Sequence, residues 1–234
     1  MAENDDETLK TKRFNRDDIL SINEITEETS DNISKVIKGI HKRYGKVINH
    51  LGHQDLTKLK KDNKKAGNLE EKVEELKDNV FYIIKSLDDG AVGAGTFYVL
   101  ILNKLQEMVE STSHIAKSSY KHVRNNHKKL KFNQIRDLKA IDSDLELLFK
   151  ETKVVFDEQS FGDIDKIVFK LRILLEKISN LIEKEVDLIR TSETSPKNTK
   201  LYFDLLLESK DLVETTIEML EQFKTYHDQA RKEL

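Results

Sequence analysis

A segment near the middle of the chain recurs in its last third, and this duplication limits what the chain can fold into. Residues 96–126 carry apolar side chains at alternating steps of three and four, which predicts one long amphipathic helix. Residues 201–223 repeat this pattern 104 positions later, with Val213 in the place of Val109 and KDLVETT in the place of QEMVEST. Matched order at a fixed offset is typical of a duplicated helical unit.

Two further helices are predicted ahead of that segment in the first half. The first extends over about residues 17–51, and Gly52 can end it. The second extends over about residues 55–87 and is weakened at Gly67, because a glycine inside a helix costs about 1 kcal/mol relative to alanine. Three glycines in six residues favour a turn at residues 88–95.

The second half follows the same plan. We expect Asn133 to cap a helix that ends at the SFGD sequence of residues 160–163, and a second helix at residues 165–190. Pro196 after Ser195 is the expected start of the last helix. Because the sequence lacks the two-residue alternation of a strand, we predict an all-α fold.

These six predicted helices divide the chain into a tail and two repeats. Residues 1–16 are polar and aperiodic, which predicts a flexible tail or linker. Residues 17–128 form the first three-helix repeat and residues 129–234 the second, and together they are expected to make one domain. Charged residues at 35% and hydrophobic residues at 37% are typical of a bundle whose core is a set of narrow apolar stripes.

Composition also limits the classes of function. The lack of cysteine excludes disulfides, thiolate catalysis and zinc ribbons, and a net charge of −3 argues against a nucleic-acid binder. No apolar run approaches the roughly 20 residues of a membrane span, and the first residues do not resemble a signal peptide, so we expect a cytoplasmic chain. We expect no enzyme activity, since neither a Gly-rich phosphate loop nor a His-Glu-x-x-His motif is present.

Two acidic pairs that the duplication retains are candidate metal ligands. Glu107 and Glu110 lie in the first copy, and Asp211 and Glu214 in the second. A buried di-metal site is not expected, because its ligands must project into the bundle and these do not follow the apolar stripe. Converging surface carboxylates can bind a hard or borderline cation, whereas a solvated helix face is the more frequent explanation of such charge.

A basic segment at residues 117–131 contains the candidates for contact with a partner or an anion: Lys121, His122, Arg124, His127, Lys128, Lys129 and Lys131. Positive charge at the C-terminal end of a helix complements the helix dipole and its free carbonyl groups, so a structural role alone explains it. The same charges suit phosphate, an anionic lipid headgroup or an acidic surface of a partner. The residues leave both interpretations open.

Four sequence segments carry a resemblance to a known family. They are LKDNVFYIIKSL at residues 76–87, FYVLILNKLQEM at 97–108, SYKHVRNNHKKL at 119–130 and LYFDLLLESKDLVE at 201–214. In this order and spacing, which covers most of residues 56–223, the chain resembles PhoU-like domains. It is most similar to the cytosolic C-terminal domain of some bacterial inorganic phosphate transporters of the PiT type.

The resemblance implies a six-helix bundle of two three-helix repeats without catalytic activity, at the inner face of the bacterial membrane. It implies regulation of phosphate transport by docking on the membrane-embedded transporter, within one chain or between chains. A homodimer is a further candidate partner, and the net charge leads us to expect no nucleic acid. PhoU-type proteins also tend to bind multinuclear metal clusters, of a divalent or iron-type metal, through an E/D-x-x-x-D motif in each repeat. Here Gln106 and Lys210 replace its first acid. This departure from the motif leads us to expect no cofactor. The alternative function is metal binding by the surface carboxylates, and a coiled-coil-like scaffold ranks third.

Overall fold

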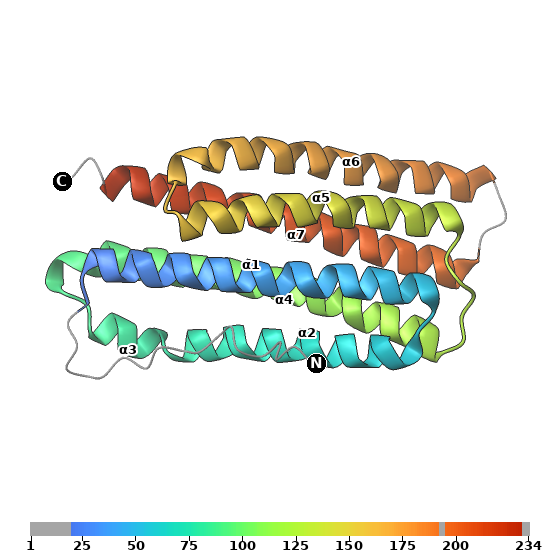
Figure 1. Cartoon of the computed structure of the whole chain (residues 1–234), viewed down its shortest axis with the longest axis horizontal. Coiled ribbons are helices and arrows are strands. Elements are labelled where there is room, and N and C mark those ends of the chain that lie inside the picture. Colours follow the sequence, from blue (N-terminus) through green and yellow to red (C-terminus); the bar gives the residue numbers. More distant parts are fainter. Residues whose placement is uncertain (1–19, 192–194, 231–234) are drawn as a thin grey trace.

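The computed structural model describes residues 20–191 and 195–230, and these residues form an all-helical bundle (Figure 1). The prediction of an all-α fold is confirmed, since the described residues hold only one isolated β-bridge, between Leu20 and Leu87. The elements in chain order are α1 (Ile22–His53), α2 (Leu56–Asp78), the short α3 (Val80–Lys85), the 3-10 turn η1 (Asp89–Ala91), α4 (Val92–Arg124), α5 (Phe132–Asp157), the 3-10 turn η2 (Phe161–Asp163), α6 (Ile164–Thr191) and α7 (Pro196–Ala230).

The long helices lie nearly parallel to one another in layers (Figure 1). Helix α4 packs along α7, and α1 packs along α5, so these two contacts join the first half of the bundle to the second. On the outside, α2 covers α4 and α1, whereas α6 covers α7 and α5. Within the described residues, every helix is too short or too polar to cross a membrane.

The first helices begin and end at local signals in the sequence. Ser21 accepts a hydrogen bond from the Glu24 backbone N–H, and the Glu24 carboxylate accepts one from the Ser21 backbone N–H, which makes a capping box at the start of α1. Helix α1 continues through Gly52, the expected stop, and ends at Gln54, whose φ of 55° is left-handed. Asp55 then caps α2 by accepting a hydrogen bond from the Lys58 N–H.

The prediction that the second helix is weakened at Gly67 is wrong. Helix α2 continues through Gly67 without interruption, because Ala66 and Leu69 beside it are buried in the core. The chain breaks instead at Asn79, between α2 and α3, where the Asn79 side chain donates to the Glu75 carbonyl oxygen at 3.0 Å. Tertiary burial thus outweighs the low helix propensity of one glycine.

Two other helix starts come earlier than expected. The turn predicted at residues 88–95 is shorter, since α4 already begins at Val92 and its Gly95 is buried. A Cβ at Gly95 would lie 2.6 Å from Cδ1 of Leu87, so the glycine allows the turn to approach the helix closely. Helix α5 begins at Phe132 after Lys131, and Asn133 is therefore inside it rather than its cap. Pro196 starts α7 as predicted, whereas the tail at residues 1–16 lies outside the described residues.

Aromatic side chains close the core at the end of the bundle where α5 meets η2. Phe223 of α7 is fully buried, and its ring centroid lies 5.5 Å from that of Phe97, 4.8 Å from that of Phe156 and 4.8 Å from that of Phe161. These residues come from α4, α5, η2 and α7, so one aromatic cluster holds both halves of the chain together.

A buried hydrogen bond links the halves at mid-length. The Tyr44 hydroxyl of α1 lies 2.8 Å from Oγ of Ser209 in α7, and Ser209 in turn donates to the Leu205 carbonyl oxygen at 2.6 Å. Tyr44 therefore donates to Ser209. Burial raises the pKa of the Tyr44 phenol, so this donor keeps its proton at physiological pH.

We predict that Gly67→Ala stabilises the protein by about 0.5–1 kcal/mol, because the helix already passes through this position and alanine has the higher helix propensity. No heavy atom lies within 4 Å of a Cβ built at Gly67. Urea unfolding measures the change. Gly45→Ala is the matched control, since its methyl group would lie 2.8 Å from Oδ1 of Asp142 and is expected to give no gain. A Gly67→Ala variant that is less stable than the parent would contradict this explanation of the unbroken helix.

Candidate functional site

The candidate metal ligands of the first half lie on one turn of α4 but bond to other side chains. Glu107 accepts hydrogen bonds from the Asn103 amide at 2.7 Å and from the Lys104 ammonium at 2.9 Å. Glu110 accepts one from the Gln106 amide at 2.8 Å. Both carboxylates are half-buried and have local donors, so neither requires a cation.

The candidates of the second half occupy the corresponding turn of α7. Glu214 pairs with Lys210 at 2.9 Å, whereas Asp211 is exposed. Desolvation, and then the nearby Glu214 carboxylate, raise the pKa of Asp211. Among the described residues, which include all four candidates, no three or more His, Asp or Glu side chains are grouped as metal ligands. The sequence-based metal hypothesis stays a prediction that the arrangement of these carboxylates does not favour.

One ion pair and one histidine–carboxylate hydrogen bond cross the contact between α4 and α7. Lys104 of α4 lies 2.8 Å from Glu218 of α7, and His114 of α4 lies 3.1 Å from Glu208 of α7. Position 208 follows position 104, and position 218 follows position 114, at the same offset of 104 residues that relates the repeated segments. The carboxylates of Glu107 and Glu218, on either side of Lys104, raise the pKa of the Lys104 ammonium and keep it protonated.

The basic segment forms the end of α4 and the connection to α5, at one tip of the bundle (Figure 1). Its exposed members are Lys121, Arg124, Lys128, Lys129 and Lys131, whereas His127 is half-buried and His122 is buried. Sequence reasoning treated His122 as a contact residue, but its exposed fraction is only 5%. The imidazole instead packs inward, where it contacts the connection between α4 and α5.

His122 organises this connection through two contacts. Its Nε2 lies 2.8 Å from the Lys128 carbonyl oxygen, and its ring packs edge-on against that of His127 with centroids 5.1 Å apart. Since a carbonyl only accepts, Nε2 carries the proton and donates. Burial lowers the pKa of His122, so the neutral ring is favoured at physiological pH.

The next helices hold the same connection from outside. Asn198, in the first turn of α7, donates to the Lys129 carbonyl oxygen at 2.6 Å. Gln134 of α5 accepts from the Lys131 N–H at 3.0 Å, and its amide donates to Glu185 of α6 at 2.9 Å. Main-chain groups of the basic segment are therefore fixed, while its cationic side chains remain in solvent.

We define the basic end as this tip of the bundle, with the exposed side chains Lys121, Arg124, Lys128, Lys129, Lys131 and Lys197. Among the described residues none of these six has an ion-pair partner, unlike many lysines elsewhere in the bundle. The opposite tip, the acidic end, carries the exposed carboxylates Glu27, Glu75, Asp78 and Glu158. The connection from α4 to α5 and the junction of α2 with α3 lie at opposite tips of the bundle (Figure 1), so these two groups of opposite charge are separated along its long axis.

A second basic feature, which sequence reasoning missed, is a hollow of about 310 Å³ between α1 and α5. Lys38, His41 and Lys42 line it from α1, and Lys150 and Lys153 line it from α5. Two of these lysines are paired: Lys150 with Glu146 at 2.5 Å, and Lys153 with Asp157. No signal in one sequence indicates such a hollow, because its walls come from helices about a hundred residues apart.

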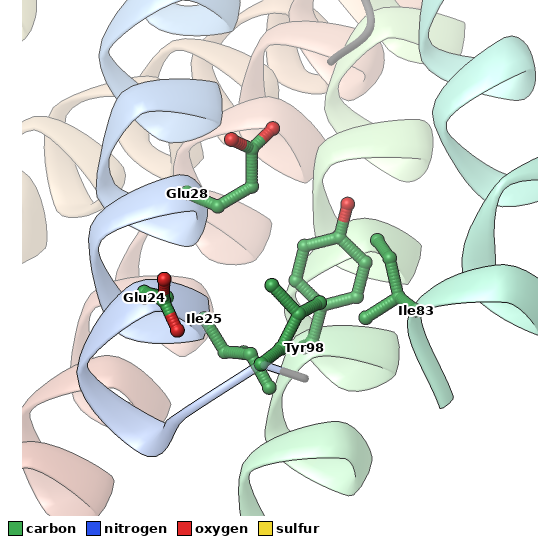
Figure 2. A pocket seen from close by; sticks show the side chains of 6 residues that line it. Glu24, Ile25, Glu28, Ile83 and Tyr98 are labelled. Carbon is green, nitrogen blue, oxygen red and sulfur yellow. The ribbon is translucent and has the colours of Figure 1, made fainter. Parts of the chain in front are cut away.

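A smaller hollow lies beside the N-terminal turns of α1 (Figure 2). It is lined by Ile25, Glu28, Ile83 and Tyr98 among others, and the Tyr98 hydroxyl points between α1 and α3. Its volume of about 10 Å³ is at the lower limit for one water molecule. This hollow is a packing defect and has no room for a ligand.

Comparison with known proteins gives no match: no family model, no curated protein and no solved structure matches this chain.

We predict that Asn198→Ala loosens the connection between α4 and α5. The change removes the donor to the Lys129 carbonyl oxygen and is expected to cost about 1 kcal/mol. Hydrogen–deuterium exchange should become faster in residues 125–131 and stay unchanged in α1. Asn180→Ala, at an exposed position of α6, is the control and should leave this exchange as it is. Equal protection in both variants would show that the Asn198 bond contributes nothing.

We also predict a pH-dependent effect at Asp142, which faces Gly45 of α1. Desolvation, and then the Glu146 carboxylate, raise the pKa of Asp142 from 3.8 to about 6, although Lys139 opposes them. Ionisation is therefore harder in the folded than in the unfolded chain, and the folded state loses stability as the pH rises through this window. Asp142→Asn should be more stabilising near neutral pH than at about pH 4.

Chemical unfolding at the two pH values measures this difference. Asp144→Asn is the control on the same helix, because Asp144 accepts a bond from Lys177 at 2.6 Å and its loss should bring no comparable gain. A gain from Asp142→Asn that is the same at both pH values would argue against ionisation as the cause.

Proposed function

We propose that this chain is a non-enzymatic, PhoU-like regulatory domain of inorganic phosphate transport that acts by docking on the membrane-embedded transporter at the inner face of the membrane. The observation that carries the proposal is the internal duplication. The offset of 104 residues matches contacts of the two halves with each other, as well as their sequences. The four segments that resemble PiT-associated domains lie in the end of α2 with α3, in α4, in the basic end and in α7.

Matched contacts in the two halves support a two-repeat arrangement. Tyr98 of α4 and Tyr202 of α7 are 104 residues apart and both buried. The Tyr98 hydroxyl bonds to Asn32 of α1, and the Tyr202 hydroxyl donates to Asp137 of α5 at 3.4 Å. In each half, a tyrosine of the third helix thus bonds to a polar side chain of the first helix, although the partners differ. Burial is the main cause that raises the pKa of both phenols, whereas the bond to Asn32 lowers the pKa of Tyr98 and the bond to Asp137 raises that of Tyr202.

The cross-links between α4 and α7 support the same arrangement. The offset of 104 residues converts the Lys104–Glu218 pair into the His114–Glu208 pair. Such a reciprocal pattern is what a two-fold axis between similar units produces. The boundary between residues 128 and 129, proposed to separate the repeats, lies in the connection from α4 to α5.

The basic end is better suited to docking, as a regulatory domain requires, than to catalysis. Its main chain is fixed by Asn198 and His122, so its side chains are presented without a large ordering cost. Its cations attract an anionic surface and affect mainly the rate and the orientation of association. Transporter and domain can belong to one chain or to two.

We predict that the triple variant Lys128→Glu, Lys129→Glu, Lys131→Glu impairs control of phosphate uptake and leaves the fold intact, because all three side chains are exposed. Uptake of radiolabelled phosphate by cells, at low and high external phosphate, measures the effect. The control reverses three exposed lysines elsewhere, Lys38, Lys85 and Lys139. Uptake that responds normally in the triple variant, or equally badly in the control, would argue against docking at the basic end.

A further inference from the structure

We propose that the basic end binds an anionic lipid surface directly, with the Phe132 ring inserted among the headgroups and the surrounding cations paired with lipid phosphates. The proposal rests on the proposed function for the presence of a membrane beside the domain. It goes further by naming a second contact of the basic end: the bilayer beside the embedded protein.

Phe132 is the observation that charge alone does not explain. It is the first residue of α5, follows Lys131 directly, and has an exposed fraction of 84%, higher than the other exposed large apolar side chains of the described residues. The ring lies outside the hydrophobic core and is almost wholly in solvent. Aromatic rings are favoured at the interface of a bilayer, where an apolar side chain leaves water while its neighbours stay hydrated.

The six cations of the basic end provide the matching electrostatic contact. They come from the end of α4, the following connection and the first turn of α7, which lie at the same tip of the bundle as Phe132. Their charge is not neutralised within the described residues. A cluster of lysines and arginines beside an apolar residue is the combination that attracts and then anchors a protein on an anionic membrane.

The charge distribution along the bundle also favours a membrane. The acidic end lies at the far tip of the bundle (Figure 1). An anionic surface therefore attracts the basic end and repels the acidic end, so the long axis of the bundle points outward from the surface. At the basic end the most exposed apolar side chain is the Phe132 ring, which a fluid surface accommodates without a preformed pocket.

The anchor is presented in a fixed position. The carbonyl groups of Lys128 and Lys129 accept bonds from His122 and Asn198, and the Lys131 N–H bonds to Gln134. The turn before Phe132 is therefore held at both sides, and little conformational freedom is lost when the ring enters the headgroup region.

Co-sedimentation of the purified chain with lipid vesicles tests the proposal. The chain should bind vesicles that mix phosphatidylglycerol with phosphatidylcholine, should not bind vesicles of phosphatidylcholine alone, and should be released by high salt, which screens exposed charges. Binding to neither kind of vesicle at low salt would overturn the proposal. Equal binding to both kinds would overturn it as well, because the cations would then have no role.

One variant and its control separate the contribution of the Phe132 ring to vesicle binding from that of the charges. Phe132→Ala should weaken partitioning onto the mixed vesicles roughly tenfold, the effect of losing one buried aromatic side chain. Phe169→Ala is the matched control, since Phe169 of α6 is also exposed, at 66%, and lies outside the basic end. It should bind as the parent does. Equal losses in the two variants, or none in Phe132→Ala, would overturn the insertion of Phe132.

The triple variant Lys128→Glu, Lys129→Glu, Lys131→Glu should lower vesicle binding at least a hundredfold, at roughly fivefold for each charge removed and more for each reversed. Vesicle binding and phosphate uptake then distinguish the lipid contact from docking on the transporter. Loss of uptake control with vesicle binding unchanged would overturn the lipid contact and leave docking on the transporter. Loss of vesicle binding with normal uptake control would support the lipid contact and argue against the proposed function.

Discussion

The contact between α4 and α7 is the one on which the rest of the bundle depends. Both helices exceed thirty residues, run antiparallel to each other and present buried side chains along most of their length. Two buried hydroxyls of these helices are satisfied locally: those of Thr112 and Thr216 donate to the carbonyl oxygens of Met108 and Leu212, four residues earlier. Helices α1 and α2 pack on α4, and α6 packs on α7, so each outer helix is positioned by this central pair.

Much of this architecture was predictable because its signals are local or periodic. The apolar stripe of residues 96–126 corresponds to α4, and Pro196 starts α7 as its fixed φ and missing N–H lead one to expect. The errors came where tertiary packing decides. Propensity placed a weak point at Gly67, but buried neighbours keep α2 helical there, and the interruption falls at Asn79, whose side chain bonds back to its own helix.

The candidate site was predictable in part, since a charge run in sequence remains a charge run on a surface. The lysines of residues 117–131 do lie exposed at one tip, whereas His122 is buried because the chain folds back over it. The exposure of Phe132 could not be foreseen, because a phenylalanine beside an apolar helix pattern is expected to be buried. Nor did the net charge of −3 indicate two oppositely charged tips, because a total charge does not show where the individual charges lie.

The separation of charge along the long axis also affects how copies of the protein meet in solution. In dilute buffer the basic end of one molecule attracts the acidic end of the next. Such a head-to-tail contact uses two different surfaces and leaves one of each unused, so it lengthens instead of closing into a symmetric pair. Added salt screens the attraction, because the Debye length is about 10 Å at an ionic strength of 0.1 M. The viscosity of a concentrated solution should therefore fall as salt is added, although the molecule as a whole is nearly neutral.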